Sequence, residues 1–152
     1  MKIFRLCLVV IFTGLWMEAL AQDKLPDNIV NALRSDDSVG LSKLVNKENV
    51  NNCYGNYSLL SHAVRFNSAK CFNLLIGLGS DVNKSCNGYV PPLMHAAKYG
   101  RLEMAKVLVG KGADINYKYE GNFGPANGET PMTYAEKNNH PEIADYIRSL
   151  KK

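Results

Sequence analysis

Residues 74–83 read LLIGLGSDVN and residues 107–116 read VLVGKGADIN, so the chain carries two near copies of one stretch. A second pair of stretches has the same spacing: residues 58–64 read SLLSHAV and residues 91–97 read PPLMHAA. Self-similarity at a fixed period, here about 33 residues, is the signature of stacked repeats of secondary structure. This repeat decides the fold class before any single helix is assigned.

Further copies extend the repeat in both directions. The sequence TPMTYA at residues 130–135 opens a copy that starts later than the repeat period predicts, so the loop before it carries six extra residues. A fainter copy comes first, where residues 29–34 and 41–45 have helical apolar spacing. We therefore expect four units, at about residues 25–53, 54–86, 87–125 and 126–152.

Each unit is predicted to contain two short antiparallel helices followed by an extended loop. Asn67, Gly100 and Asn139 fall between the helices of successive units, and Gly79 and Gly112 close second helices. Gly and Asn adopt the left-handed backbone conformation of such turns most easily. One unit cannot bury its apolar faces alone, so the units must stack. The sequence thus predicts an all-α solenoid of helix-turn-helix units with extended, β-hairpin-like loops.

These motifs resemble the ankyrin repeat family, whose pattern runs Thr-Pro-Leu-His-x-Ala-Ala, a Gly turn, Leu-Leu and Gly-Ala-Asp-Val-Asn. The third unit follows the pattern most closely, from Pro92-Leu93 through Gly100 to residues 112–116. The resemblance covers about residues 29–150. It implies an ankyrin-repeat solenoid that binds other proteins on a concave surface made of loop tips and first helices.

The chain departs from the family pattern at its histidine. That position holds Ser61, Met94 or Thr133, whereas His62 and His95 stand one position later. The hydrogen bonds that the family's histidine makes are therefore not expected here. We expect both histidines to occupy partly buried helix positions.

The first residues have the parts of a secretory signal peptide. Basic residues precede an apolar run at 6–16, and residues 19–21 (ALA) match a cleavage site. The alternative is a membrane anchor, but spanning takes about 20 apolar residues and Glu18 follows the run. We expect residues 1–21 to be removed, leaving an ankyrin-repeat domain at 22–152 with no membrane association. It would be a bacterial-type exported protein, periplasmic in a Gram-negative cell and otherwise secreted.

Composition and motifs exclude several function classes. With 46% hydrophobic and 21% charged residues the chain is neither disordered nor collagen-like. Its net charge is +4, and +3 without residues 1–21, which is too mild for a nucleic-acid binder. The cysteines lack a Cys-x-x-Cys pair, the histidines are dispersed, and residues 121–124 (GNFG) lack the context of a phosphate loop. We expect a monomer that is not an enzyme and holds no cofactor or metal.

The cysteines leave a choice open. Cys53 and Cys86 are one repeat period apart, in equivalent loops. Equivalent atoms of stacked helices lie about 8 to 10 Å apart, whereas a disulfide needs Cα atoms within about 7 Å. The two loops differ in length, however, and flexible tips could move together. The two thiols are therefore free, paired with each other or joined to a partner, while Cys71 is expected to be buried and inert.

Aromatic and basic residues gather where the family resemblance places the binding surface. Tyr offers a large contact area with a polar tip at little entropy cost. The long loop at 117–129 would either fold over the concave surface as a flap or contact a partner beyond the reach of the shorter loops. The candidate partner-binding residues are Tyr54, Tyr57, Arg65, Phe66, Tyr89, Lys98, Tyr99, Tyr117, Tyr119 and Phe123.

Two functions follow from these patterns. The first is a non-catalytic, exported protein-protein interaction module that holds or inhibits an exported enzyme or toxin. The second is a redox- or metal-linked protective protein that uses Cys53 and Cys86.

Overall fold

The structure is a computed structural model, and it describes residues 24–121 and 125–151. The expected signal peptide at 1–21 and Phe123 lie outside the described residues. Within those ranges the chain forms eight helices in four consecutive pairs. The pairs are α2 (Asp27–Arg34) with α3 (Ser38–Ser42), α4 (Leu59–Phe66) with α5 (Ala69–Leu78), α6 (Pro92–Tyr99) with α7 (Leu102–Gly110), and α8 (Pro131–Lys137) with α9 (Pro141–Ser149).

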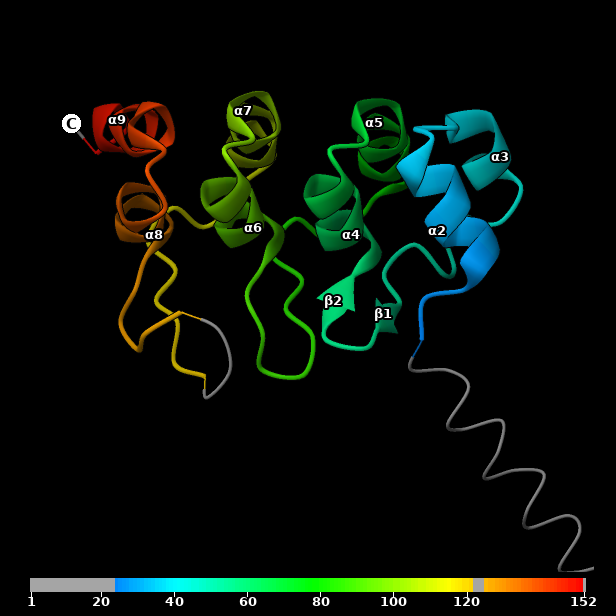
Figure 1. The fold of residues 1–152 in the computed structure, drawn as a ribbon, viewed down its shortest axis with the longest axis horizontal. Coiled ribbons are helices and arrows are strands. Elements are labelled where there is room, and N and C mark those ends of the chain that lie inside the picture. The colour runs from blue at the N-terminus through cyan, green and yellow to red at the C-terminus, as the bar shows by residue number, and fades with distance from the viewer. Residues whose placement is uncertain (1–23, 122–124, 152) are drawn as a thin grey trace, which may run out of the picture.

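The pairs stack side by side into a solenoid. Figure 1 shows the first helices α2, α4, α6 and α8 in one row and the second helices in another row, above them in this view. The loops that precede α4, α6 and α8 all project to the same side, beyond the row of first helices (Figure 1). The predicted all-α solenoid is confirmed.

The turns use the residues that the sequence indicated. Asn67 and Gly100, between the helices of the two central pairs, have φ of 59° and 66°, and Asn139 has φ of 60°. Before α4 the chain forms a short antiparallel hairpin of β1 (Cys53–Tyr54) and β2 (Tyr57–Ser58). Among the described residues, strands occur only in this one hairpin, so only the loop before α4 forms the expected hairpin as paired strands.

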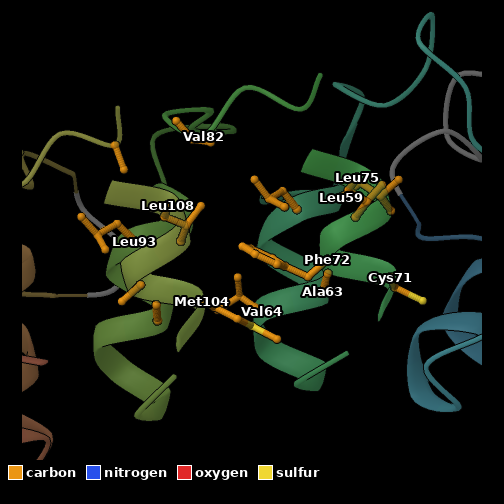
Figure 2. Packing of buried hydrophobic residues seen from close by; sticks show 14 of the residues in the cluster. Leu59, Ala63, Val64, Cys71, Phe72, Leu75, Val82, Leu93, Met104 and Leu108 are labelled. Carbon is orange, nitrogen blue, oxygen red and sulfur yellow. The ribbon is translucent and has the colours of Figure 1, made fainter. Parts of the chain in front are cut away.

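A continuous apolar core runs through the stack, from Leu25 in the first unit to Ile147 in the last. Figure 2 shows Phe72 pointing from α5 toward the next unit, which carries Met104 and Leu108. Cys71, the preceding residue, points the opposite way, toward the first unit (Figure 2). Adjacent residues of one helix thus join both neighbouring units, which is how a repeat stack gains its stability.

Asparagine side chains connect the loop ends of successive units. The Oδ1 atom of Asn51 accepts a hydrogen bond from the Asp81 N–H at 2.8 Å, and the Nδ2 atom donates to the Gly79 carbonyl. Asn83 makes the same two contacts one unit later, with the N–H of Asp114 at 2.9 Å and the carbonyl of Gly112 at 3.0 Å. The terminal Asn of the repeated motif therefore fixes the register between units.

An aspartate from the first unit caps a helix of the second. The Asp36 carboxylate accepts hydrogen bonds from the backbone N–H groups of Lys70 and Cys71, at 3.0 and 2.9 Å, in the first turn of α5. Burial acts to raise the pKa of Asp36, but the N–H groups of Cys71 and Lys70 outweigh it and lower the pKa. The charged carboxylate therefore stabilises the contact between the first two units.

The substitution Asp36→Asn is expected to lower the free energy of unfolding by about 1 kcal/mol. It keeps a residue that tolerates the positive φ of 52° at this position, but it leaves one acceptor oxygen in place of two and removes the charge. Urea denaturation measures the change. Asp27→Asn, an exposed aspartate in the first turn of α2, is the matched control. An equal loss in both variants would contradict the capping role.

Candidate functional site

Aromatic rings form an unbroken row along the first helices of the two central units. The Phe66 and His62 rings stack at 6.4 Å, and His62 meets Tyr57 edge to face at 5.4 Å. Tyr57 in turn meets His95 edge to face at 5.1 Å, and His95 stacks on Tyr99 at 6.3 Å. These five residues, here named the aromatic row, connect the last turn of α4 to the last turn of α6.

The same pattern in each unit produces this row. His62 and Phe66 lie four residues apart on α4, as His95 and Tyr99 do on α6, and side chains at this spacing share one helix face. Tyr57, from β2, inserts its ring between the two histidines.

Three cations lie over rings of the row. The guanidinium carbon of Arg65 is 4.0 Å from the centre of the Tyr57 ring. Arg34, at the end of α2, lies 5.7 Å from the centre of the Phe66 ring, and the ammonium nitrogen of Lys98 lies 5.4 Å from that of Tyr99. Cations at these distances are attracted to the negative face of an aromatic ring. The surface is therefore both aromatic and positively charged.

The two histidines of the row are almost fully enclosed. His62 is 8% exposed and its Nε2 atom lies 3.4 Å from the Tyr54 carbonyl, while His95 is 4% exposed and neither of its ring nitrogens has a hydrogen-bond partner among the described residues. Burial is the main cause that lowers the pKa of His62 to about 4 and that of His95 to about 3, and the charge of Arg65 contributes at both rings, with Lys98 adding to it at His95. Both rings are neutral at neutral pH.

Acid is expected to destabilise the fold through these histidines. The pKa values of both histidines are lower in the folded chain than the value of about 6.5 in the unfolded chain. As the pH falls below 6.5, the unfolded chain binds protons that the folded chain does not, so the free energy of unfolding decreases progressively. The loss is on the order of 1 kcal/mol per histidine for each pH unit. Urea denaturation at about pH 7.5 and pH 5.5 measures it. The double variant His62→Gln, His95→Gln should show a smaller difference between the two pH values, and an unchanged difference would contradict the assignment.

A disulfide joins the loops that support the row. The structure pairs Cys53 with Cys86, with their Cα atoms 5.9 Å apart. The expectation that ideal stacking keeps these Cα atoms too far apart is wrong for this pair, because helix packing does not set the distance between loop tips. Asn87 and Gly88 have positive φ and close a turn in which the Tyr89 N–H donates to the Cys86 carbonyl at 2.9 Å. That turn brings Cys86 against the neighbouring hairpin.

Two more contacts hold these loops together. The Asn87 side-chain amide donates to the Gly55 carbonyl at 2.8 Å, and the rings of Tyr57 and Tyr89 meet edge to face at 5.5 Å.

Within the described residues Cys71 is the one free cysteine. It is fully buried, and burial together with nearby Asp36 raises the pKa of its thiol to about 11. Its thiolate is therefore scarce at neutral pH, and the thiol is inert.

One predicted binding residue lies inside the protein. Tyr119 was expected on the surface, but it is fully buried and packs with Val90, Met94 and Tyr134. Its backbone pairs with the far end of its loop: the Tyr119 N–H donates to the Glu129 carbonyl at 2.9 Å, and the Gly128 N–H donates to the Tyr119 carbonyl at 2.7 Å. A long loop without regular structure needs an apolar anchor, and Tyr119 is that anchor. It is not a partner-binding residue.

The other predicted residues divide into two groups. Tyr54 packs against the main core and Tyr117 against the Tyr119 cluster, so both are half-buried supports of the loops. Six residues come together at the aromatic row, and we name them the row face: Tyr57, Arg65, Phe66, Tyr89, Lys98 and Tyr99. The sequence did not predict that His62, His95 and Arg34 belong to this group. For the histidines, the spacing of four residues to Phe66 or Tyr99 already indicates a shared helix face.

The described residues contain no group of three His, Cys, Asp or Glu side chains arranged to hold a metal ion. In the same part of the chain, every helix is too short or too polar to cross a bilayer.

Comparison with known proteins places the chain in a family. A search of curated proteins finds no match. A family model described as "Ankyrin repeats (3 copies)" matches residues 21–119 and, in an overlapping match, residues 60–151. Ankyrin repeats are protein-protein interaction modules and are generally non-catalytic. The two matches span most of the sequence and agree with the stacked helix pairs, so the chain belongs to the ankyrin repeat family.

Proposed function

We propose that this chain is an exported, non-catalytic module that binds a partner protein on the row face. One observation carries the proposal: the aromatic row runs without a break across two units, with cations over its rings, and Tyr57, Phe66 and Tyr99 reach the surface above the two buried histidines. Tyr57, Tyr89 and Tyr99 lie outside the continuous core and keep part of their surface exposed. Phe66 also keeps part of its ring exposed while it packs against that core. Half-exposed Tyr and Arg side chains gathered at one place are typical of binding hot spots.

The loops beneath the row face are cross-linked to each other, which favours binding. The Cys53–Cys86 disulfide and the Asn87–Gly55 hydrogen bond connect the two loops that carry Tyr57 and Tyr89. A surface that is ordered before binding loses little conformational entropy when the partner arrives.

Export is supported by two features of the sequence and the structure. Residues 1–21 have the pattern of a signal peptide. A disulfide between the loops that precede α4 and α6 is suited to an oxidising compartment, such as the periplasm or the outside of the cell. The partner that we propose is therefore another exported protein, such as an enzyme or a toxin that this monomeric module holds or inhibits.

The redox alternative has less support. Cys86 is only 2% exposed, so an attacking thiolate has poor access to its sulfur, and the Cys71 thiol is inert. Both features suit a structural disulfide better than an exchanging one.

A pull-down from the exported fraction of the source cell, read by mass spectrometry, tests the proposed function. The bait is the chain of residues 22–152, compared with its Phe66→Ala, Tyr99→Ala variant. The matched control is Val39→Ala, Tyr146→Ala, which removes an exposed and a half-buried apolar side chain from the row of second helices. Circular dichroism verifies that all three are folded. A partner held by wild type and control but lost by the row variant is expected, and a partner retained by the row variant would overturn the proposal.

A further inference from the structure

The two central units are almost free of negative charge. Between Glu48 and Glu103 the sequence has a single acidic residue, Asp81, but five basic ones: Arg65, Lys70, Lys84, Lys98 and Arg101. Asp81 lies in the loop after α5, where its carboxylate accepts the Asn83 N–H at 2.8 Å. Neither α4 nor α6 contains an acidic residue.

Arg65 and Lys98, the two cations of the row face, have no carboxylate partner among the residues that the structure describes. Neither forms an ion pair within the described residues, and both charges are close enough to His95 to lower its pKa. The neighbouring unit contributes Glu129, but Lys137 already pairs with that carboxylate at 2.6 Å.

Buried polar atoms of two residues at the row, Arg65 and His95, lack hydrogen-bond partners among the described residues. The Arg65 Nε atom is buried without a partner, and so are both ring nitrogens of His95, a residue that is 4% exposed. A buried donor or acceptor without a hydrogen-bond partner costs free energy, and native proteins contain few such groups. A guanidinium that stacks on a ring still has its N–H groups in its own plane, which is the geometry for binding a carboxylate.

Resting on the proposed function, we propose that the row face binds an acidic segment of the partner protein, one carboxylate of which accepts hydrogen bonds from Arg65 beside Tyr57 while Lys98 pairs with another. The excess of basic residues in the two central units and the two cations without ion pairs both call for a negatively charged ligand. Nucleic acid fits less well, because the rings of the row stack on one another or lie under cations and so offer no free face to a base.

Peptide titration tests this inference directly. The probe is a short peptide that alternates glycine and glutamate, and its control replaces every glutamate with glutamine. Binding to ¹⁵N-labelled residues 22–152 is followed at low ionic strength by amide chemical shifts and calorimetry. We expect the glutamate peptide to bind, to shift amides of α4 and α6, and to weaken as salt is added. No binding, or equal binding of the glutamine peptide, would overturn the inference.

Charge-matched variants separate a specific site from a general charge effect. Arg65→Gln, Lys98→Gln should bind the glutamate peptide about tenfold more weakly than wild type. Lys43→Gln, Lys111→Gln removes the same charge at the ends of α3 and α7, in the other row of helices, and should bind within about twofold of wild type (Figure 1). Equal weakening in the two variants would contradict a site at the row face, and tighter binding of single-stranded oligothymidine than of the peptide would replace the acidic segment with a nucleic acid.

This test can fail independently of the proposed function. If the peptide does not bind but the Phe66→Ala, Tyr99→Ala variant still loses its partner, the row face binds protein without recognising acidic residues. If the partner is also retained, both the proposed function and this inference are wrong.

Discussion

Replacing Phe72 with alanine is expected to lower the free energy of unfolding by about 3 to 5 kcal/mol, the loss typical of a large aromatic side chain removed from a core. Phe72 is 1% exposed and points from α5 into the interface with the third unit (Figure 2). Small domains are stable by only about 5 to 15 kcal/mol, so this one change removes a large part of the total. Because units of a repeat protein are stabilised by their neighbours, the second and third units should also begin to unfold separately.

Urea denaturation followed by circular dichroism measures this loss, and Phe66→Ala is the matched control. Phe66 belongs to the same unit but keeps part of its ring exposed, so its loss should be less than half of that for Phe72. A Phe72→Ala variant within about 1 kcal/mol of wild type would contradict the packing described for this interface.

Removing the Cys53–Cys86 disulfide is expected to lower the free energy of unfolding by about 2 to 4 kcal/mol. The bond joins residues separated by 33 positions, and a cross-link over such a loop restricts the unfolded chain strongly. The variant Cys53→Ala, Cys86→Ala is compared with wild type by urea denaturation without reductant. The same comparison with reductant is the control, because it should bring the stability of the wild-type chain close to that of the variant.

Thiol titration gives an independent check on the pairing. In the chain of residues 22–152, without reductant, we expect no rapid reaction in the folded state, since Cys71 is buried and its pKa is raised to about 11. After denaturation a single thiol, that of Cys71, should react. Reaction of three thiols would show that Cys53 and Cys86 are not bonded in solution.

The sequence predicted the features of the fold that repeat along the chain. The fixed repeat period and the Asn and Gly turn residues were sufficient for the helix pairs, because the left-handed turns depend on local backbone preference. The recurring Val-Asn pair at residues 50–51 and 82–83 also marks the loop ends, where the side chains of Asn51 and Asn83 bind the next unit.

Features that depend on contacts between loops could not be predicted in this way. Tyr119 follows the pattern of an exposed loop aromatic, and only its packing with Val90 and Met94 shows that it anchors the loop. The separation of Cys53 and Cys86 depends on a turn at Asn87, which helix spacing does not describe.

The role of the histidines was missed for a different reason. The sequence pattern indicates partly buried helix positions for His62 and His95, whereas their significance lies in the row that they complete on either side of Tyr57. A contact between rings from α4, β2 and α6 is a tertiary property.

Hydrogen-deuterium exchange of residues 22–152, alone and bound to the captured partner, tests the central claim most directly. Backbone amides in residues 57–66 and 86–99, which carry the row face, should exchange more slowly in the complex, while those of α5 and α7 should change little. Slower exchange confined to the second helices, with the row face unchanged, would show that the partner binds elsewhere and would contradict the account.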